Sequence, residues 1–310
     1  MKLLIAYDGS ECSDAAIVDL RRAGLPTVAE ALILSVQEAC SPVAAGHYSG
    51  EASESGACLS EVLEREAADA GQSREACAFA ALAADRLRGD FPGWRISTEA
   101  WVDQAASAII RESHAWRPDL IVVGSHGRTG LSRLVLGSVS EHVTHQVDCS
   151  VRIGRHHLHC QQRAIRLLIG VDGSENARAA VKAVAARNWP AGAEARVVGV
   201  LDSRIQIAAA TTLEGTIPVA IEDEARRRMS GAVHEAAQEL KKSGLLVTHQ
   251  VLAGRPSDVL IAEADKWGAD CIFLGARRLS GLERILLGSV SSCVAAHAPC
   301  SVEIVRSNSR

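Results

Sequence analysis

The stretch KLLIAYDGSE at residues 2–11 decides the fold, because it returns as RLLIGVDGSE at residues 166–175 with seven of ten positions identical. A second stretch, GLSRLVLGSVS at residues 130–140, returns as GLERILLGSVS at residues 281–291 with eight of eleven positions identical. Recurrence in a fixed order is the mark of a repeated structural unit. The 310 residues therefore hold two copies of one unit, called here the first and the second repeat.

The two repeats differ in length between these blocks. The first block recurs after 164 residues and the second after 151, so the first repeat carries about 13 extra residues. They fall between 40 and 72, where Ala, Ser, Gly and Glu prevail, and we expect a loop over 41–56 and a helix over 59–87. The expected divisions are a first domain at 1–154, a polar linker at 155–163 and a second domain at 164–310.

Each repeat is predicted to alternate strands with helices. Short apolar runs indicate buried strands, and periodic apolar positions indicate helices. This alternation favours an α/β fold of two tandem, doubly wound, mostly parallel, five-stranded, Rossmann-like sheets. In the first repeat we expect strands at 3–7, 31–36, 95–102, 120–123 and 149–153, and helices at 14–23, 104–116 and 138–146. In the second repeat we expect strands at 167–171, 196–201, 247–252, 271–274 and 301–305.

The loop after the fourth strand carries the chemistry of the first repeat. It reads GSHGRTGLSRLVLGS from Gly124 to Ser138, with the spacing G-x2-G-x9-G-S. Glycines such as Gly124 and Gly127 allow positive φ and a close approach of the backbone to an anion. The pair Gly137-Ser138 opens a helix, whose free N–H groups and positive dipole end attract phosphate. The alternative is that these glycines only form tight turns. Ligands of such sheets bind beyond the carboxyl ends of the strands, at the switch point between strands one and four.

This spacing and the Asp-Gly-Ser turn resemble the universal stress protein family, whose ATP-binding members carry G-x2-G-x9-G-[S/T]. The likeness extends over nearly the whole chain, twice, and so resembles the tandem type of the family. It implies an adenine nucleotide alpha hydrolase-like fold that binds ATP or another adenine nucleotide, with or without Mg²⁺, and hydrolyses it slowly at most. The positions that match the nucleotide site are Asp8, Val36, Gly124, Gly127, Gly137 and Ser138.

Two of these positions have plainer explanations. Asp8 can be an N-cap or turn residue before the first helix, and Val36 can be a core residue. The resemblance further implies an internal pseudo-dimer, in which 149–153 pairs with 301–305. Pairing also has a physical motive, because an unpaired apolar edge strand invites aggregation. Whether two chains form a homodimer stays open.

The second repeat departs from the pattern at one glycine. It reads Gly275-Ala-Arg-Arg278, so Arg278 replaces the middle glycine of the loop. If that position needs positive φ, arginine costs about 1 kcal/mol and crowds the phosphates; alternatively its guanidinium pairs with phosphate. We therefore expect nucleotide mainly in the first domain. The matching positions that the second repeat retains are Asp172, Val200, Gly275, Gly288 and Ser289.

Composition excludes several classes of function. The net charge of −4 and the 3% of aromatic residues argue against a nucleic-acid partner, which needs a basic surface and stacking side chains. No apolar run reaches the roughly 18 residues of a membrane span. Nine cysteines without a regular framework indicate reduced thiols and a cytoplasmic protein, and the lack of a CxxC pair argues against a zinc ribbon or a thioredoxin-type site.

Three functions remain to be weighed. The first is a stress-response or regulatory protein that binds an adenine nucleotide. The second is a structural or interaction module of the same fold that binds none. The third, an adenylating enzyme, is disfavoured because the chain lacks both a G-x4-G-K-[S/T] loop and an SGGxDS loop after strand one. No catalytic residue and no metal ligand is predicted, since His156, His157 and His159 fit a polar connector better than a metal site.

Overall fold

The computed structural model describes residues 1–38, 73–126, 136–155, 163–202, 219–276 and 287–307. In the first repeat the strands are β1 (Lys2–Ala6), β2 (Ala29–Gln37), β3 (Trp94–Val102), β4 (Leu120–Gly124) and β5 (Ser150–Gly154). The helices between them are α1 (Glu11–Asp19), α3 (Arg74–Asp90), α4 (Ala105–Trp116) and α5 (Ser138–Gln146), with a 3-10 turn at Leu20–Arg22.

The second repeat has the same order of elements. Its strands are β6 (Arg166–Val171), β7 (Glu194–Asp202), β8 (Leu246–Gly254), β9 (Cys271–Gly275) and β10 (Ser301–Val305). Its helices are α6 (Glu175–Ala185), α8 (Val219–Lys242), α9 (Pro256–Trp267) and α10 (Ser289–His297). Every strand predicted from the sequence is present, with ends that differ by at most two residues.

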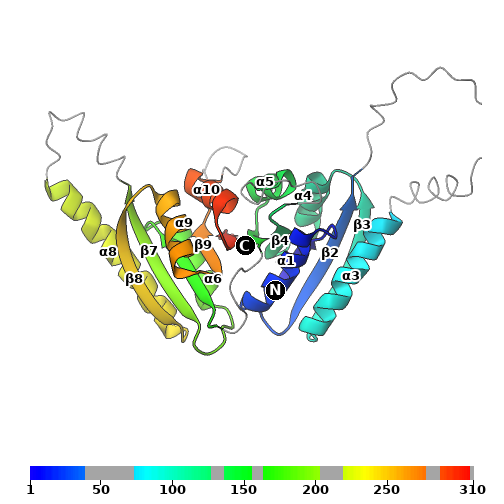
Figure 1. Ribbon diagram of the computed structural model, residues 1–310, viewed down its shortest axis with the longest axis horizontal. Coiled ribbons are helices and arrows are strands. Elements are labelled where there is room, and N and C mark those ends of the chain that lie inside the picture. The colour runs from blue at the N-terminus through cyan, green and yellow to red at the C-terminus, as the bar shows by residue number, and fades with distance from the viewer. Residues whose placement is uncertain (39–72, 127–135, 156–162, 203–218, 277–286, 308–310) are drawn as a thin grey trace, which may run out of the picture.

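All ten strands join in one sheet, in the order β3-β2-β1-β4-β5-β10-β9-β6-β7-β8. Pairs within a repeat are parallel, whereas β5 and β10 pair antiparallel across the junction. The two five-stranded sheets are therefore halves of one sheet that spreads from the junction as two wings (Figure 1). The pairing of the fifth strands is the one expected from the sequence.

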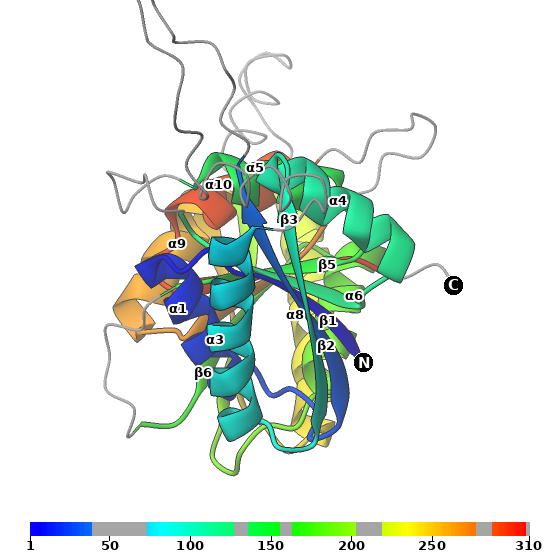
Figure 2. The same cartoon turned by 90° about the vertical axis from the view of Figure 1, so that its right-hand side faces the viewer.

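Helices cover both faces of each half of the sheet. On the first half, Leu3 and Ile5 of β1 pack with α1 and α3, whereas Leu4 packs on the face of α4 and α5. This follows from the alternation of side chains along a strand, and because both faces are covered the strand is apolar throughout. Figure 2 shows α3 and α4 on opposite sides of β1 and β2. The second half repeats this arrangement, with α6 and α8 on one face and α9 and α10 on the other.

Serine side chains fix the start of several helices. Ser10 accepts a hydrogen bond from the Ser13 N–H, so α1 begins at Glu11, three residues before the expected start. Ser73 does the same for α3, which begins at Arg74. The expected helix over 59–87 is thus found in its second part, and its first part lies outside the described residues, as does the expected loop at 41–56.

Candidate functional site

The first candidate site, site 1, is a cavity of about 400 Å³ at the carboxyl ends of β1 and β2. Asp8, Val36, Gly137 and Ser138 line it together, so the chain brings four predicted residues to one place. Since β1 lies between β2 and β4, this is the switch point at which ligands of doubly wound sheets bind. Gly127 lies outside the described residues.

The Asp-Gly-Ser turn holds Asp8 in a fixed position. One oxygen of the Asp8 carboxylate, Oδ1, accepts from the Ser10 N–H at 3.0 Å and from the Ser10 hydroxyl at 2.6 Å. Gly9 between them has φ of +75°, which a side chain rarely adopts. Asp8 is therefore a turn residue, and the N-cap of α1 is Ser10. The turn does not take Asp8 out of the site, because Asp8 lines the cavity.

The first turn of α5 offers donors to the cavity. Gly137 is its N-cap and supplies no side-chain cap, so the N–H groups that follow are not used by a capping side chain. Such a helix start favours an anion. The Ser140 hydroxyl donates to the carbonyl oxygen of Gly124 at 2.6 Å, which ties α5 to the end of β4.

Gly124 is required for a reason that differs from the prediction. Its φ is not in the left-handed region, and it is not among the residues that line site 1. A Cβ atom at Gly124 would lie 2.8 Å from the backbone of Cys12, because β4 ends directly under the start of α1. Gly275 has the same role, since its Cβ would lie 2.2 Å from the backbone of Asn176. At these two positions the glycine makes room for a helix.

His126 also lines site 1. Burial and the nearby Arg155 lower the pKa of its imidazole, which favours the neutral ring at neutral pH. Its Nδ1 lies 3.2 Å from the Ser125 hydroxyl. A neutral imidazole beside the glycine loop can donate one hydrogen bond and accept another.

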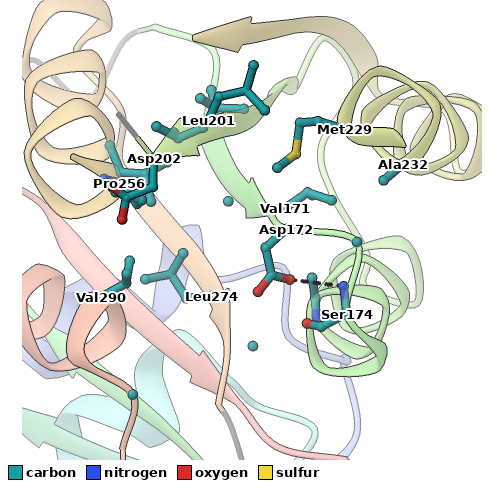
Figure 3. A pocket seen from close by; sticks show the side chains of 18 of the residues that line it. Val171, Asp172, Ser174, Leu201, Asp202, Met229, Ala232, Pro256, Leu274 and Val290 are labelled. Atoms are coloured by element: carbon teal, nitrogen blue, oxygen red, sulfur yellow. Dashed lines mark hydrogen bonds between the residues drawn. The ribbon is translucent and has the colours of Figure 1, made fainter. Parts of the chain in front are cut away.

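The second candidate site, site 2, is the equivalent cavity of the second repeat and measures about 940 Å³. All five retained positions line it, namely Asp172, Val200, Gly275, Gly288 and Ser289. Asp172 accepts from the Ser174 N–H at 3.0 Å, and Gly288 starts α10 without a side-chain cap. Figure 3 shows Asp172 and Met229 on one side of the space, with Leu274 and Val290 on the other. Arg278 lies outside the described residues.

Helices α3 and α8 explain the difference in size. Their buried positions match at an offset of 153 residues, since Ala80, Ala83, Ala84 and Leu87 correspond to Val233, Ala236, Ala237 and Leu240. At this offset Phe79 corresponds to Ala232. A Cβ at Gly9 would lie 2.4 Å from the Phe79 ring, whereas a Cβ at Gly173 would lie 3.6 Å from the Ala232 methyl group. Phe79 thus fills space that is open in site 2.

At the same offset, one wall position carries opposite charges in the two sites. Glu75 in site 1 corresponds to Arg228 in site 2. The described ionisable residues of site 1 are thus acidic apart from His126, whereas site 2 also has Arg178 and Arg228 on its wall. Both arginines bind a neighbouring glutamate, Arg178 to Glu175 and Arg228 to Glu224. These wall residues are not predictable from the sequence, because the extra residues that precede α3 prevent an alignment of the two repeats in this region.

A sequence model of the universal stress protein family matches residues 1–155 and again residues 165–306. The chain belongs to this family. Two domains of this family are therefore present. The predicted resemblance is confirmed.

Individual universal stress proteins support this placement. One from Synechocystis is 41% identical over 69 residues, a match that covers 22% of this chain and 45% of that protein, so the chain spans less than half the length of that relative. One from Mycolicibacterium smegmatis is 25% identical over 321 residues, covering 98% of this chain and 96% of that protein. The crystal structure of one from Archaeoglobus fulgidus matches with a TM-score of 0.64, 19% identity and 98% coverage of both chains, which supports the fold.

Two further observations concern the described residues. No helix among them is both long and apolar enough to cross a bilayer. The six cysteines in this part of the chain are free thiols, and burial raises the pKa of Cys149 and of Cys300 to about 12. These two thiols are therefore protonated at neutral pH and poorly reactive.

Proposed function

We propose that this universal stress protein binds ATP or another adenine nucleotide at sites 1 and 2. The observation that carries the proposal is that an uncapped helix start, at Gly137 and again at Gly288, faces a cavity at the switch point of a parallel sheet. Both volumes fall in the range of small-molecule sites, about 300–1,000 Å³. The phosphates would lie at the helix start and the adenosine beside Val36 or Val200.

An aspartate in the lining of each cavity bears on the form of the nucleotide. Asp8 and Asp172 would repel a bare triphosphate, since like charges at close range are unfavourable. A divalent cation between carboxylate and phosphate removes this conflict, and Mg²⁺ is commonly bound through one or two carboxylates and phosphate oxygens. We therefore propose the Mg²⁺ complex as the bound form. Neither site contributes an evident general base among the described residues, so any hydrolysis is expected to be slow.

Two arguments rank the sites in opposite order. The complete glycine spacing favours site 1, as expected from the sequence. The larger cavity, the small Ala232 and the arginines on its wall favour site 2. The first ranking stays a prediction that depends on Gly127 and Arg278, and variants of each site can decide it.

The experiment is mass spectrometry of the ligand released from the denatured purified protein, followed by calorimetric titration with ATP, ADP and AMP with and without Mg²⁺. An adenine nucleotide in the first step, or saturable binding in the second, supports the proposal. Absence of both would leave the second candidate function, a structural module that binds no nucleotide.

A further inference from the structure

We propose that the buried ion pair between Arg152 and Glu303 determines which partner each fifth strand accepts, so that the first domain pairs with the second domain and rejects a second copy of itself. The two strands at the junction are otherwise nearly alike. Strand β5 reads SVRIG and β10 reads SVEIV, with Ser, Val and Ile in common. Their shapes alone would permit three pairings: first with second, first with first, and second with second.

Several contacts of the junction are the same in both directions, although Arg187 and Asn188 also donate one-way hydrogen bonds to the carbonyl oxygens of Ala23 and Gly24. The Arg155 N–H donates to the Ser301 hydroxyl, and the Arg306 N–H donates to the Ser150 hydroxyl, both at 3.1 Å. These residues correspond at the offset of 151 residues that relates the repeats. Such contacts would form equally in a pair of two first domains, so they do not favour the mixed pair.

The arginine side chains behave in the same way. The Arg155 guanidinium donates to the carbonyl oxygen of Cys300 at 3.3 Å, and that of Arg306 donates to the carbonyl oxygen of Cys149 at 3.0 Å. Each also reaches the last turn of the opposite helix, α10 or α5. The polar frame of the junction is therefore two-fold symmetric.

The two-fold symmetry of the junction is broken at its centre, where β5 and β10 carry opposite charges. The register of the antiparallel pair places Glu303 opposite Arg152, and these two positions also correspond by sequence. The Arg152 Nη1 lies 3.0 Å from the Glu303 Oε2, and both side chains are 1% exposed. In a pair of two first domains Arg152 would face Arg152, and in a pair of two second domains Glu303 would face Glu303. Like charges in a buried interface cost several kcal/mol, which is how charge excludes wrong partners.

Two flanking groups extend the pattern. Arg152 also donates to Asp19 at 2.6 Å, and Glu303 also binds Arg187. The charges of Asp19, Arg152, Glu303 and Arg187 therefore alternate in sign along one row. A pair of two first domains or of two second domains would place two like charges at the centre of this row. The ion pair between Arg22 and Asp270 also crosses between the domains, but Asp119 stands at the equivalent position of the first domain, so that pair does not discriminate.

The test starts from the folded full chain. A protease recognition sequence is inserted in the linker at 156–162 and cut in the folded state. The cut protein is then left to exchange in urea below the unfolding transition, and native mass spectrometry weighs the pairs, since the two halves differ in mass. We expect mixed pairs almost alone. If the halves exchanged without a preference, homotypic pairs would make up about half of all pairs. That fraction is at least about fivefold higher than the fraction expected with selection.

The decisive variant is R152M/E303M, which replaces the ion pair by apolar side chains of similar length. Because it also removes the ion-pair partner of Asp19 and of Arg187, it should be less stable than the original, so its exchange is followed below its own unfolding transition. It should still pair, and its homotypic fraction should approach one half. A second variant, R152Q/E303Q, checks that the result does not come from a packing defect. The control R21Q/D90N removes an exposed ion pair of the first domain and should behave as the original.

Two results would overturn the proposal. One is a statistical mixture in the original cut protein. The other is an undisturbed excess of mixed pairs in both neutral variants, which would assign the selection to other contacts.

Discussion

Arg155 and Arg306 each donate hydrogen bonds to carbonyl oxygens in the last turn of a helix of the opposite domain. Arg155 donates to the carbonyl oxygen of Ala295 near the end of α10, and Arg306 donates to that of Thr144 near the end of α5. Both side chains are buried, and helix carbonyls at this end otherwise lack partners. The sequence suggests nothing of this exchange, because Arg155 falls at the start of a polar linker and Arg306 just past the last strand.

Removal of either arginine should loosen the junction. We expect Arg306→Met to lower the free energy of unfolding by about 3 kcal/mol, since it leaves buried carbonyl oxygens without charged donors. Urea unfolding followed by far-UV circular dichroism measures the change. The control Arg21→Met, which loses an exposed ion pair with Asp90, should lose at most about 1 kcal/mol. Equal losses in the two variants would contradict this account.

Exchange of Phe79 and Ala232 should shift nucleotide between the sites. Ala232→Phe puts a ring into site 2 and should weaken binding there by about tenfold or more, equivalent to about 1.4 kcal/mol. Phe79→Ala should strengthen binding at site 1, because the space beside Gly9 opens. Calorimetry with ATP and Mg²⁺ gives the stoichiometry and affinity of each variant. If neither change alters them, the ring does not limit the cavity.

The glycine loops give a second test of site occupancy. Gly127→Arg gives the first domain the residue that the second domain carries at Arg278, and it should abolish binding at site 1, because a phosphate held by backbone N–H groups must approach to about 3 Å. Arg278→Gly should strengthen binding at site 2. ATP titration of the two variants and of the original chain measures both effects. An unchanged affinity in Gly127→Arg would remove the loop from the phosphate site.

Gly124→Ala should destabilise the fold even in the absence of nucleotide. Its Cβ would overlap the backbone of Cys12, so α1 must move away from β4, and we expect a loss of about 1–3 kcal/mol. The matched control is Gly89→Ala in α3, where nothing lies within 4 Å of the new atom. That change should stabilise by about 0.5–1 kcal/mol, since glycine is unfavourable inside a helix. Thermal unfolding distinguishes the two.

Tyr7 should make stability fall at alkaline pH. Burial, together with the hydrogen bond that its hydroxyl donates to Asp14 at 2.5 Å, raises its pKa to about 12. The unfolded chain loses the Tyr7 proton near pH 10, whereas the folded chain keeps it, so the folded state is progressively disfavoured between pH 10 and about 12. Urea unfolding of Tyr7→Phe as a function of pH should lack this component. The same slope in variant and original would contradict it.

The strands were predictable because each is a short apolar run that repeats at a known offset. Leu3, Leu4 and Ile5 are almost fully buried, and β10 has the expected bounds. The expected start of α1 lies three residues too late, because the Asp-Gly-Ser pattern indicates a turn and does not show that Ser10 is the N-cap. The packing role of Gly124 could not be predicted for a different reason. A close contact between β4 and α1 depends on tertiary packing, which the local sequence does not encode.

The candidate site was predictable where it lies on the repeated blocks. Asp8, Gly137 and Ser138 come from those blocks, and the structure brings them together with Val36. Phe79, Glu75 and Arg228 lie on helices outside the blocks, where only the burial pattern of the folded helices shows which residues correspond. The prediction therefore lacked the part of each cavity that α3 or α8 contributes. This is the part in which the two domains differ.

The antiparallel pairing of β5 with β10 has a consequence for mass action. Two separate domains that meet through this edge would dissociate on dilution, whereas two domains on one chain meet at an effective concentration set by the linker, typically in the millimolar range for short connections. The closed edge therefore persists at any cellular copy number. Each chain therefore carries one pair of domains, and with it two cavities, from the time it is synthesised. A change in expression alters the number of such pairs but not the fraction of domains that are paired.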